Sequence, residues 1–445
     1  MSVSKEAFEQ FRAGVGMLAE MAPPATERSD EERVRIFKNT VIKSILPRQA
    51  MDLETCVHCG MCAEACHYYV TTRDPKYTPV RKLELTRRVY QREVSPNRWL
   101  RRLLTRDITA QELEEWQELV YDSCTECGRC SLICPMGIHI AEMVVLTREA
   151  LANAGLAVAE QRAMSYEQGE RGTMFGMGKD MLVQATETLK GKGIDIPLDQ
   201  PQAEILVVTS GIEMALFTDA LEGTAKIMNK LGCSWTVSTC GFEAANFGYM
   251  AGYREYYRAA AMRVIEAAIG VGAKTVIIPE CGHSYPALRW DGAAVYGKPL
   301  PFEVLAISEF IGREIKAGNL KVNKMSTAGK VTYHDPCKLG RVGGVFDEPR
   351  EALQALGLDL SEVKPNRAQS YCCGGGAGNF LIRRAAPLRA KVWELKREQF
   401  EDAGADAVVT SCASCRINFM AGAADTHWEK PIESLVALVG ANLAD

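Results

Sequence analysis

Long apolar segments are missing from this chain of 445 residues. The longest candidate, residues 259–276, is interrupted by Arg263, Glu266 and Lys274. A transmembrane helix needs about 20 consecutive, mainly apolar residues. The sequence therefore excludes a spanning helix, and any contact with a membrane is expected to be peripheral or to go through a partner protein.

A secretory leader is also missing from the start of the sequence. Residues 1–14, MSVSKEAFEQFRAG, contain neither an apolar segment nor a twin-arginine motif. We therefore expect a cytoplasmic protein in a reducing compartment. Its 16 cysteines are then available as metal ligands, because disulfides rarely persist in the cytosol.

The excess of positive charge that is typical of nucleic-acid-binding proteins is absent, since the formal net charge is -4. No nucleic-acid partner is expected. Positive charge is nevertheless concentrated between residues 73 and 106, where the acidic residues are Asp74, Glu84 and Glu93. The basic residues of this segment are Arg73, Lys76, Arg81, Lys82, Arg87, Arg88, Arg92, Arg98, Arg101, Arg102 and Arg106.

Two interpretations of this basic segment are open. It forms either a solvated helical face or a docking surface for anionic lipid headgroups or an acidic partner. In the second case Trp99 and Leu100, beside Arg98, add a shallow apolar anchor. Salt should then weaken the attachment, because exposed charges are screened over about 8 to 10 Å at physiological ionic strength.

Cysteine, by contrast, is plentiful and occurs in two matched runs. Each run has the spacing C-x2-C-x2-C-x3-C, which is typical of ferredoxins that hold two cubane 4Fe-4S clusters. In such proteins the fourth cysteine of each run binds the other cluster. The first predicted ligand set is Cys56, Cys59, Cys62 and Cys134. The second predicted set is Cys124, Cys127, Cys130 and Cys66.

Zinc is the alternative metal for these runs, and two matched four-cysteine runs disfavour it. Pro135 follows the last cysteine of the second run, as is usual in ferredoxins. In the first run His67 stands at the corresponding position. This departure changes the turn after Cys66 and removes no ligand.

A third cysteine group lies near the end of the sequence, with the pattern C-x34-CC-x38-C-x2-C. Its members are Cys337, Cys372, Cys373, Cys412 and Cys415. Zinc is satisfied by four ligands, so five thiols from three distant segments indicate a multi-iron cluster. Gly374, Gly375 and Gly376 follow the vicinal pair, and we expect them to let the backbone approach the cluster and point N–H groups at sulfur.

The tetrapeptide HDPC, residues 334–337, has two open interpretations. It is either a turn whose Asp335 caps the following helix or a part of the reaction site. In the second case His334 supplies protons, since disulfide cleavage and quinone reduction consume them and histidine titrates near neutral pH. His283 is a second candidate of this kind.

Together these motifs resemble the heterodisulfide reductase D-type iron-sulfur subunits, from about residue 47 to residue 445. In that family two ferredoxin clusters precede a cysteine-rich (CCG) domain, whose motif carries a further 4Fe-4S-type cluster that is often noncubane. Similar subunits occur in the Dsr, Hmc, Tmc and Isp-type hydrogenase complexes. The resemblance implies three clusters per chain and an oxidoreductase subunit.

The same resemblance implies a membrane-associated complex on the cytoplasmic face of the inner membrane. The chain would exchange electrons between the quinone pool, through a cytochrome b-like subunit, and a hydrogenase, another cytoplasmic redox subunit or a thiol/disulfide couple. Its catalytic residues would be Cys337, Cys372, Cys373, Cys412, Cys415 and His334. An alternative is the electron-accepting subunit of a flavoprotein 2-hydroxy acid oxidase acting on glycolate or lactate.

We expect an α+β multidomain fold, in which a helical two-cluster ferredoxin domain precedes a duplicated α/β cysteine-rich domain. Residues 1–46 form an N-terminal helical appendage packed on the ferredoxin domain, which covers 47–150. Residues 151–202 form a linker, residues 203–325 a degenerate repeat and residues 326–445 an intact repeat. Short apolar runs between the helical segments of the two repeats, among them 275–279 and 407–410, predict buried parallel strands.

The internal repeat rests on three pairs of segments. Residues 207–212, 238–248 and 278–284 correspond in order to YHDPCK, SYCCGGGAGNF and VTSCASC of the intact repeat. Cys240 and Cys281 then match Cys373 and Cys412, and Ser284 falls where Cys415 stands. Cys240 and Cys281 are expected to be either buried remnants or ligands for a metal or a substrate sulfur.

Overall fold

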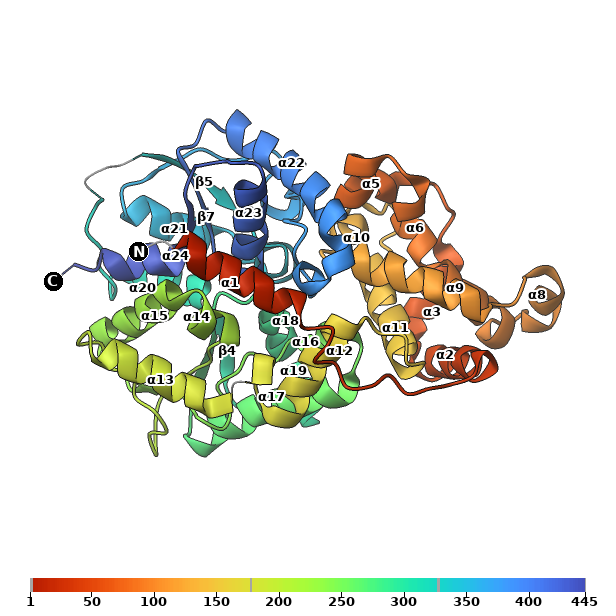
Figure 1. Ribbon diagram of the computed structural model, residues 1–445, viewed down its shortest axis with the longest axis horizontal. Helices are drawn as coiled ribbons and strands as arrows, with labels where there is room; N and C mark the ends of the chain where they lie inside the picture. The colour runs from red at the N-terminus through yellow and green to blue at the C-terminus, as the bar shows by residue number, and fades with distance from the viewer. Residues whose placement is uncertain (1–2, 177, 326–328, 445) are drawn as a thin grey trace.

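The computed structural model describes residues 3–176, 178–325 and 329–444. A helical part forms one end of the elongated molecule, and two α/β units form the other (Figure 1). The expected start of the intact repeat, at residue 326, lies outside the described residues. Among the helices that the structure describes, none combines the length and the apolar character needed to cross a membrane.

The first two helices, α1 (Lys5–Gly16) and α2 (Asp30–Ser44), pack in different places. Phe37 and Val41 of α2 are buried among helices of the ferredoxin part. Phe8 of α1 instead shares a buried cluster with Phe380 and Ile417 of the second α/β unit. The N-terminal residues therefore do not pack on the ferredoxin part alone, because the apolar face of α1 finds its partners elsewhere.

The ferredoxin part consists of short helices that hold the cysteine-bearing turns. Pro47 and Pro79 start two of them, consistent with the preference for proline in the first helical turn. Ser29 and Thr109 cap α2 and α9 by accepting backbone hydrogen bonds from Glu32 and Glu112. The helices are α3 (Pro47–Thr55), α4 (Met61–Ala65), α5 (His67–Thr72), α6 (Pro79–Lys82), α7 (Glu84–Val89), α8 (Arg98–Leu104), α9 (Ala110–Gln117), α10 (Arg129–Ile133) and α11 (Ile140–Asn153).

The expected linker, residues 151–202, contains two further helices. These are α12 (Ala159–Tyr166) and α13 (Gly178–Lys190). Met164 of α12 is fully buried in the cluster that also holds Phe8, and Leu182 of α13 is buried against the first α/β unit. This stretch therefore contributes side chains to the interior of the molecule.

The first α/β unit contains a four-stranded parallel sheet with the order β2-β1-β3-β4. Its strands are β1 (Ile205–Val207), β2 (Trp235–Thr236), β3 (Thr275–Ile278) and β4 (Glu303–Ala306). Its helices are α14 (Gly211–Ala215), α15 (Thr218–Leu231), α16 (Phe247–Ala251), α17 (Arg254–Gly270), α18 (Ser284–Arg289), α19 (Gly292–Tyr296) and α20 (Ile307–Lys316). Leu206 and Val207 point to different buried clusters, so both faces of the sheet are covered.

The second α/β unit repeats this topology, with the parallel strand order β6-β5-β7-β8. Its strands are β5 (Lys330–His334), β6 (Asp359–Leu360), β7 (Ala407–Thr410) and β8 (Ile432–Ser434). Its helices are α21 (Asp347–Ala355), α22 (Ala386–Asp402), α23 (Ala413–Asp425) and α24 (Leu435–Ala441). The chain is therefore a mixed α/β protein with two parallel sheets.

The two units pack through reciprocal helix pairs, α15 against α24 and α20 against α21. At the first crossing the backbones touch, because a Cβ built on Gly440 would overlap the Cα of Gly223. At the second, a Cβ on Gly312 would lie 2.5 Å from the Cα of Glu348. Glycine is required at both crossings, since any larger residue would separate the helices.

A single buried guanidinium joins three parts of the chain. Arg148 of α11 is fully buried, and its nitrogens donate to main-chain carbonyls on every side. The acceptors are Val120 and Cys124 of the ferredoxin part, Met250 of the first α/β unit and Ala377 of the second. The ferredoxin part is therefore fixed to both units from within.

Candidate metal centres

Four cysteines from both ferredoxin runs line one cavity, here called the distal cavity. Cys56, Cys59 and Cys62 come from the turn that leads into α4, and Cys134 follows α10. Val57, Met136 and Ile138 complete the walls. Cys59 is exposed, so this cavity lies near the molecular surface.

The other four ferredoxin cysteines line a second cavity, here called the proximal cavity. Its thiols are Cys66, Cys124, Cys127 and Cys130, together with His67 and Lys82. Each cavity thus contains three cysteines of one run and the last cysteine of the other. This grouping is the same as the two ligand sets that the spacing predicts.

The two cysteine turns share one backbone conformation. In the first, His58 and Gly60 have φ angles of 55° and 80°, and in the second, Glu126 and Gly128 have φ angles of 52° and 74°. Left-handed residues flanking the second cysteine curl the chain around the space that its neighbours enclose. Four soft thiolate donors around one closed space suit iron in a 4Fe-4S cluster.

The five cysteines of the third group meet in the second α/β unit. Cys337 follows β5, the vicinal pair lies in the loop after β6, and Cys412 follows β7 directly. The carboxyl ends of adjacent parallel strands lie at one edge of the sheet, where binding sites of such folds occur. All five are buried, and they share one cluster with Trp393 and Phe419.

The vicinal pair stands at the centre of this group. The pKa of Cys373 lies well below its usual range, because the Cys372 and Cys415 thiols donate hydrogen bonds to it. The pKa of Cys372 is well above its usual range, because its proton is held by Cys127, Cys337 and Cys373. The group is therefore a compact set of sulfurs within hydrogen-bonding reach of one another.

The loop after the vicinal pair supplies backbone donors to these sulfurs. The N–H of Gly374 lies 3.4 Å from Cys372 Sγ, and the N–H of Gly375 lies 3.4 Å from Cys373 Sγ. A Cβ on Gly375 would lie 2.8 Å from the Ser414 carbonyl oxygen, and one on Gly376 would lie 3.2 Å from the His283 ring. These glycines permit a close approach that any side chain would block.

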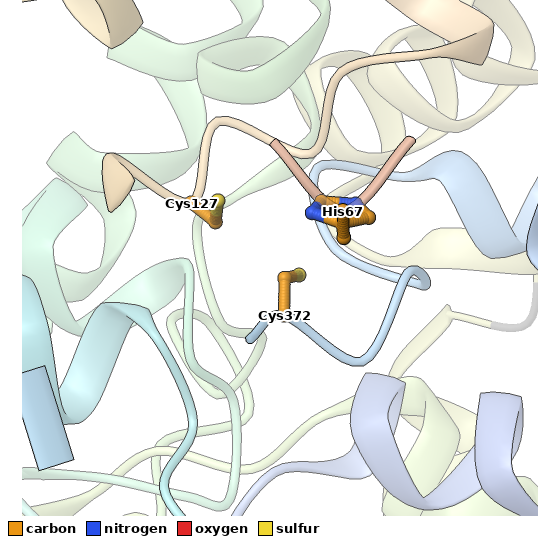
Figure 2. A group of neighbouring side chains, drawn as sticks. All are labelled: His67, Cys127 and Cys372. Carbon is orange, nitrogen blue, oxygen red and sulfur yellow. The ribbon is translucent and has the colours of Figure 1, made fainter. Parts of the chain in front are cut away.

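The proximal cavity adjoins the third cysteine group through His67, Cys127 and Cys372. One ligand atom from each of the three lies within 4.8 Å of the others, and all three residues are buried. Figure 2 shows the side chains converging from three separate segments. Thr125 Oγ1 also lies 3.2 Å from Cys372 Sγ. Two sites that are far apart in the sequence therefore touch.

Two arginines hold this junction in place. The guanidinium of Arg341 donates to the carbonyls of Cys127, at 2.6 Å, and Ala368, at 2.7 Å. Arg129 donates to the carbonyl of Gln369 at 2.8 Å and stacks on the ring of Tyr371, with 3.8 Å to the centroid. No pattern in the sequence indicates the contacts with Cys127 and Gln369, because each joins segments more than 200 residues apart.

His334 lies within the third group and is fully buried. One of its ring nitrogens and the sulfurs of Cys373 and Cys415 lie within 4.8 Å of one another. Burial lowers the pKa of its imidazole. Asp335 turns away from the cysteines, accepting hydrogen bonds from Arg350 at 2.8 and 2.9 Å and from the N–H of Arg367 at 2.7 Å. His334 therefore contacts the cysteine group, whereas the neighbouring Asp335 is bound by the two arginines.

The first α/β unit forms a wall of the third site. A Cβ on Gly282 would lie 3.3 Å from Cys412 Sγ, and His283 faces Gly376. Cys281 is partly buried and accepts a hydrogen bond from Asn246 Nδ2 at 3.1 Å. Cys240 is exposed and lines none of these three sites.

Protein-family models match both cysteine systems. A 4Fe-4S dicluster domain matches residues 52–138, which contain all eight ferredoxin cysteines, and a cysteine-rich (CCG) domain matches residues 331–420, which contain the third group. The chain therefore has the domains of an iron-sulfur protein, in the order that the cysteine spacing predicts.

Similar whole proteins are known from archaea and bacteria. The chain is 28% identical to an Hdr-like menaquinol oxidoreductase iron-sulfur subunit of Archaeoglobus fulgidus, over 89% of this chain and 80% of that protein. It is also 28% identical to the D-type subunit of the dihydromethanophenazine:CoB–CoM heterodisulfide reductase of Methanosarcina acetivorans, over 89% of this chain and 95% of that one. An EtfAB:quinone oxidoreductase of Syntrophomonas wolfei is 27% identical over 83% of this chain and 55% of its own length. Over most of its length, in its two domains and in their cysteines, this chain is therefore similar to the heterodisulfide reductase-type iron-sulfur subunits.

Proposed function

We propose that this chain is the iron-sulfur subunit of a heterodisulfide reductase-like, quinone-linked oxidoreductase. The observation that carries the proposal is the contact between Cys127 of the proximal cavity and Cys372 of the third cysteine group. It gives electrons a short route from the ferredoxin part into the second α/β unit. The names of the relatives, which include a menaquinol oxidoreductase subunit and a quinone oxidoreductase, support the link to quinone.

Three ligand sets follow from this proposal. The distal cavity takes one cubane cluster, the proximal cavity takes another, and the third group binds a further 4Fe-4S-type cluster through Cys337, Cys372, Cys373, Cys412 and Cys415. Such clusters accept and pass single electrons, with potentials set by burial and by hydrogen bonds to sulfur. The third set is also the proposed reaction site.

The protein's own groups prepare this reaction site. The N–H groups of Gly374 and Gly375 point at the cysteine sulfurs and stabilise negative charge there. Burial of all five cysteines excludes bulk water. The imidazole of His334, with a ring nitrogen within 4.8 Å of the Cys373 and Cys415 sulfurs, is the proposed carrier of a proton when a thiol/disulfide couple reacts.

We further infer that the two α/β units are copies of one ancestral cysteine-rich domain, at about residues 203–325 and 326–445. Their strand orders are equivalent, and two helix pairs join the units reciprocally. An early helix of the first unit, α15, packs on the last helix of the second, α24. The early helix α21 of the second unit packs in the same way on α20, the last helix of the first. A two-fold relation between copies produces this reciprocal packing. The ferredoxin domain is proposed to cover about 47–150, after an N-terminal segment at 1–46 and a connection at 151–202.

The proposed partners are a cytochrome b-like membrane subunit, the quinone pool and a cytoplasmic redox subunit. The chain would then lie on the cytoplasmic face of the membrane. Support comes from the quinone-linked relatives.

Anaerobic purification, iron and sulfide assay and EPR spectroscopy test the ligand sets, and we expect about twelve iron atoms per chain. The purified complex should couple oxidation of a menaquinol analogue to reduction of the chain, with or without a disulfide acceptor. Zinc in the third group would refute the proposed site. Reduction by a flavoprotein 2-hydroxy acid dehydrogenase, without quinol activity, would support the glycolate or lactate oxidase alternative in its place.

A further inference from the structure

The short helix α8 exposes its apolar side chains to solvent. Trp99, Leu103 and Leu104 are 70%, 80% and 77% exposed, Leu100 is exposed as well, and no residue of the helix is buried. An amphipathic helix on a globular protein normally buries its apolar face against the core. In α8 the apolar side chains point away from the rest of the chain.

The arginines of α8 occupy its opposite face. At 100° per residue, Trp99, Leu100, Leu103 and Leu104 form one continuous stripe, and Arg98, Arg101 and Arg102 lie across from it. Arg101 forms an ion pair with Glu54 of α3 at 2.9 Å, and Arg102 pairs with Glu93 and donates to the carbonyl of Arg92 at 3.0 Å. The charged face therefore attaches the helix to the protein and leaves the apolar face free.

The rest of the basic segment is also largely neutralised within the chain. Arg73 pairs with Glu64 at 3.2 Å, and Lys76 pairs with Glu118 at 2.7 Å. Arg88 and Arg106 both pair with Glu112. Few charges of the segment are therefore free for the expected docking to an anionic partner. The dominant feature of this surface is the apolar stripe of α8.

The position of α8 suits a contact with a flat surface. Figure 1 shows it at the end of the long axis opposite the two termini, standing out beyond α9. Met51 of α3, one helical turn before Glu54, is a further exposed apolar side chain, at 67%. The seven residues of α8 are too few to span a bilayer but enough to lie in its interface.

We propose that α8 inserts its apolar stripe into the headgroup region of a phospholipid bilayer and so holds the protein on the membrane surface. Tryptophan and leucine beside arginine form the combination that partitions into this region. Arg98 is exposed and makes no ion pair with any residue that the structure describes, so its guanidinium is available to a lipid phosphate. The anchoring is apolar, so it should resist salt.

This inference deepens the proposed function, because it names the element that meets the membrane. Glu54, which holds Arg101, lies two residues before Cys56 of the distal cavity. The helix that would meet the bilayer is therefore attached to the protein close to the distal cavity in the sequence. The other possible occupant of the stripe is an apolar groove on a membrane protein, and vesicles without protein distinguish the two.

The test is co-sedimentation of the purified, cluster-loaded chain with phosphatidylcholine vesicles, at about 0.1 M and about 1 M salt. We expect the wild-type chain to bind neutral vesicles at both salt concentrations. Leu103→Glu combined with Leu104→Glu should weaken vesicle binding at least about tenfold, because two charged groups replace the two most exposed side chains of the stripe. The matched control is Ile269→Glu combined with Trp290→Glu, at two exposed apolar positions of the first α/β unit, and should bind like the wild type.

Iron content and visible absorption of both variants must equal those of the wild-type chain, which excludes misfolding as the cause. Three results overturn the proposal: no binding of the wild type, equal loss in the control variant, or binding that needs anionic lipid and disappears at high salt. Retention on native membranes without any binding to protein-free vesicles also overturns it and identifies a protein groove as the occupant. The assay needs no quinone turnover, so it can fail or succeed independently of the proposed function.

Discussion

The two α/β units have equivalent strand orders, yet the ends of their strands carry different chemistry. In the second unit the loops after β5, β6 and β7 supply the five thiols of the third group. In the first unit the segments after β1, β2 and β3 supply the buried carboxyl groups of Glu213, Glu243 and Glu280. The same topological edge is therefore occupied by thiols in one unit and by carboxyl groups in the other.

Burial favours the protonated form of the carboxyl groups of the first unit. Burial raises the pKa of Glu243 to about 8 and that of Glu280 to about 7. Burial, and then the neighbouring Glu280, raise the pKa of Glu213 well above its usual range. The N–H of Gly211 donates to Glu243 at 2.9 Å. Strand topology thus determines where polar side chains gather, whereas the loop residues determine what they can bind.

The largest expected difference between the units concerns their cysteines. Cys373→Ser should remove the third cluster, about one third of the iron, and leave the EPR signals of the two ferredoxin clusters. Cys240→Ser, at the matched position of the first unit, should leave iron content unchanged because Cys240 is exposed and outside all three sites. Cys373 is preferred to Cys372, whose contact with Cys127 would disturb the proximal cluster as well. Equal iron loss in both variants would remove the distinction between the units.

A smaller difference is expected for glycine. Gly375→Ala should destabilise the protein by about 1–3 kcal/mol, because the new methyl group would lie 2.8 Å from the Ser414 carbonyl oxygen. Gly270→Ala in the first unit meets nothing within 4 Å and should be neutral or stabilising by up to about 1 kcal/mol. Anaerobic thermal unfolding with matched cluster content measures both. An unaffected Gly375→Ala variant would contradict the close approach at the third site.

The smallest expected effect is the pH dependence of stability that the buried carboxyl group of Glu243 gives to the first unit. Because the pKa of Glu243 rises from 4.5 to about 8 on folding, the folded state keeps a proton that the unfolded state loses. The contribution of Glu243 to the free energy of unfolding is therefore greatest below about pH 4.5. It decreases as pH rises to about 8, by up to about 1.4 kcal/mol per pH unit. Glu243→Gln should flatten the fall in unfolding temperature between about pH 6 and pH 8.

The control for this pH effect is Glu204→Gln, which removes an exposed carboxyl paired with Lys274. Its pKa is lowered by that lysine, so it is ionised in both states throughout the range and the slope should stay as in the wild type. If Glu243→Gln has the wild-type slope, the carboxyl of Glu243 does not carry the buried proton.

Local spacing was sufficient to group the cysteines. In a C-x2-C-x2-C-x3-C run the first three cysteines lie on one turn and the fourth lies on the far side of a short helix, so it reaches the neighbouring cavity. The apolar runs that predicted strands, such as 275–279 and 407–410, correspond to β3 and β7, because β-branched residues buried on both faces leave a clear pattern.

Contacts between distant segments could not be predicted in this way. His67 looked like a mere departure from the ferredoxin pattern, yet it faces Cys127 and Cys372. The basic segment appeared free to bind an external partner, but the sequence cannot show that Glu54, Glu93 and Glu112 lie close enough to pair with its arginines. Both outcomes depend on how helices pack in three dimensions, which single-sequence patterns do not encode.

Arg148 has a consequence for how this protein can be altered by recombination. The sequence order of the ferredoxin part and the two α/β units suggests modules that can be exchanged separately. The Arg148 guanidinium, however, donates to carbonyls from all three parts. A chimera that replaces any one module loses an acceptor for a buried charged donor, at about 1–3 kcal/mol for each group left unpaired. Transplanting the ferredoxin part into another scaffold therefore requires moving, or redesigning, the carbonyl-bearing loops at Met250 and Ala377 with it. The segments that accept hydrogen bonds from Arg148 therefore have to be transferred together.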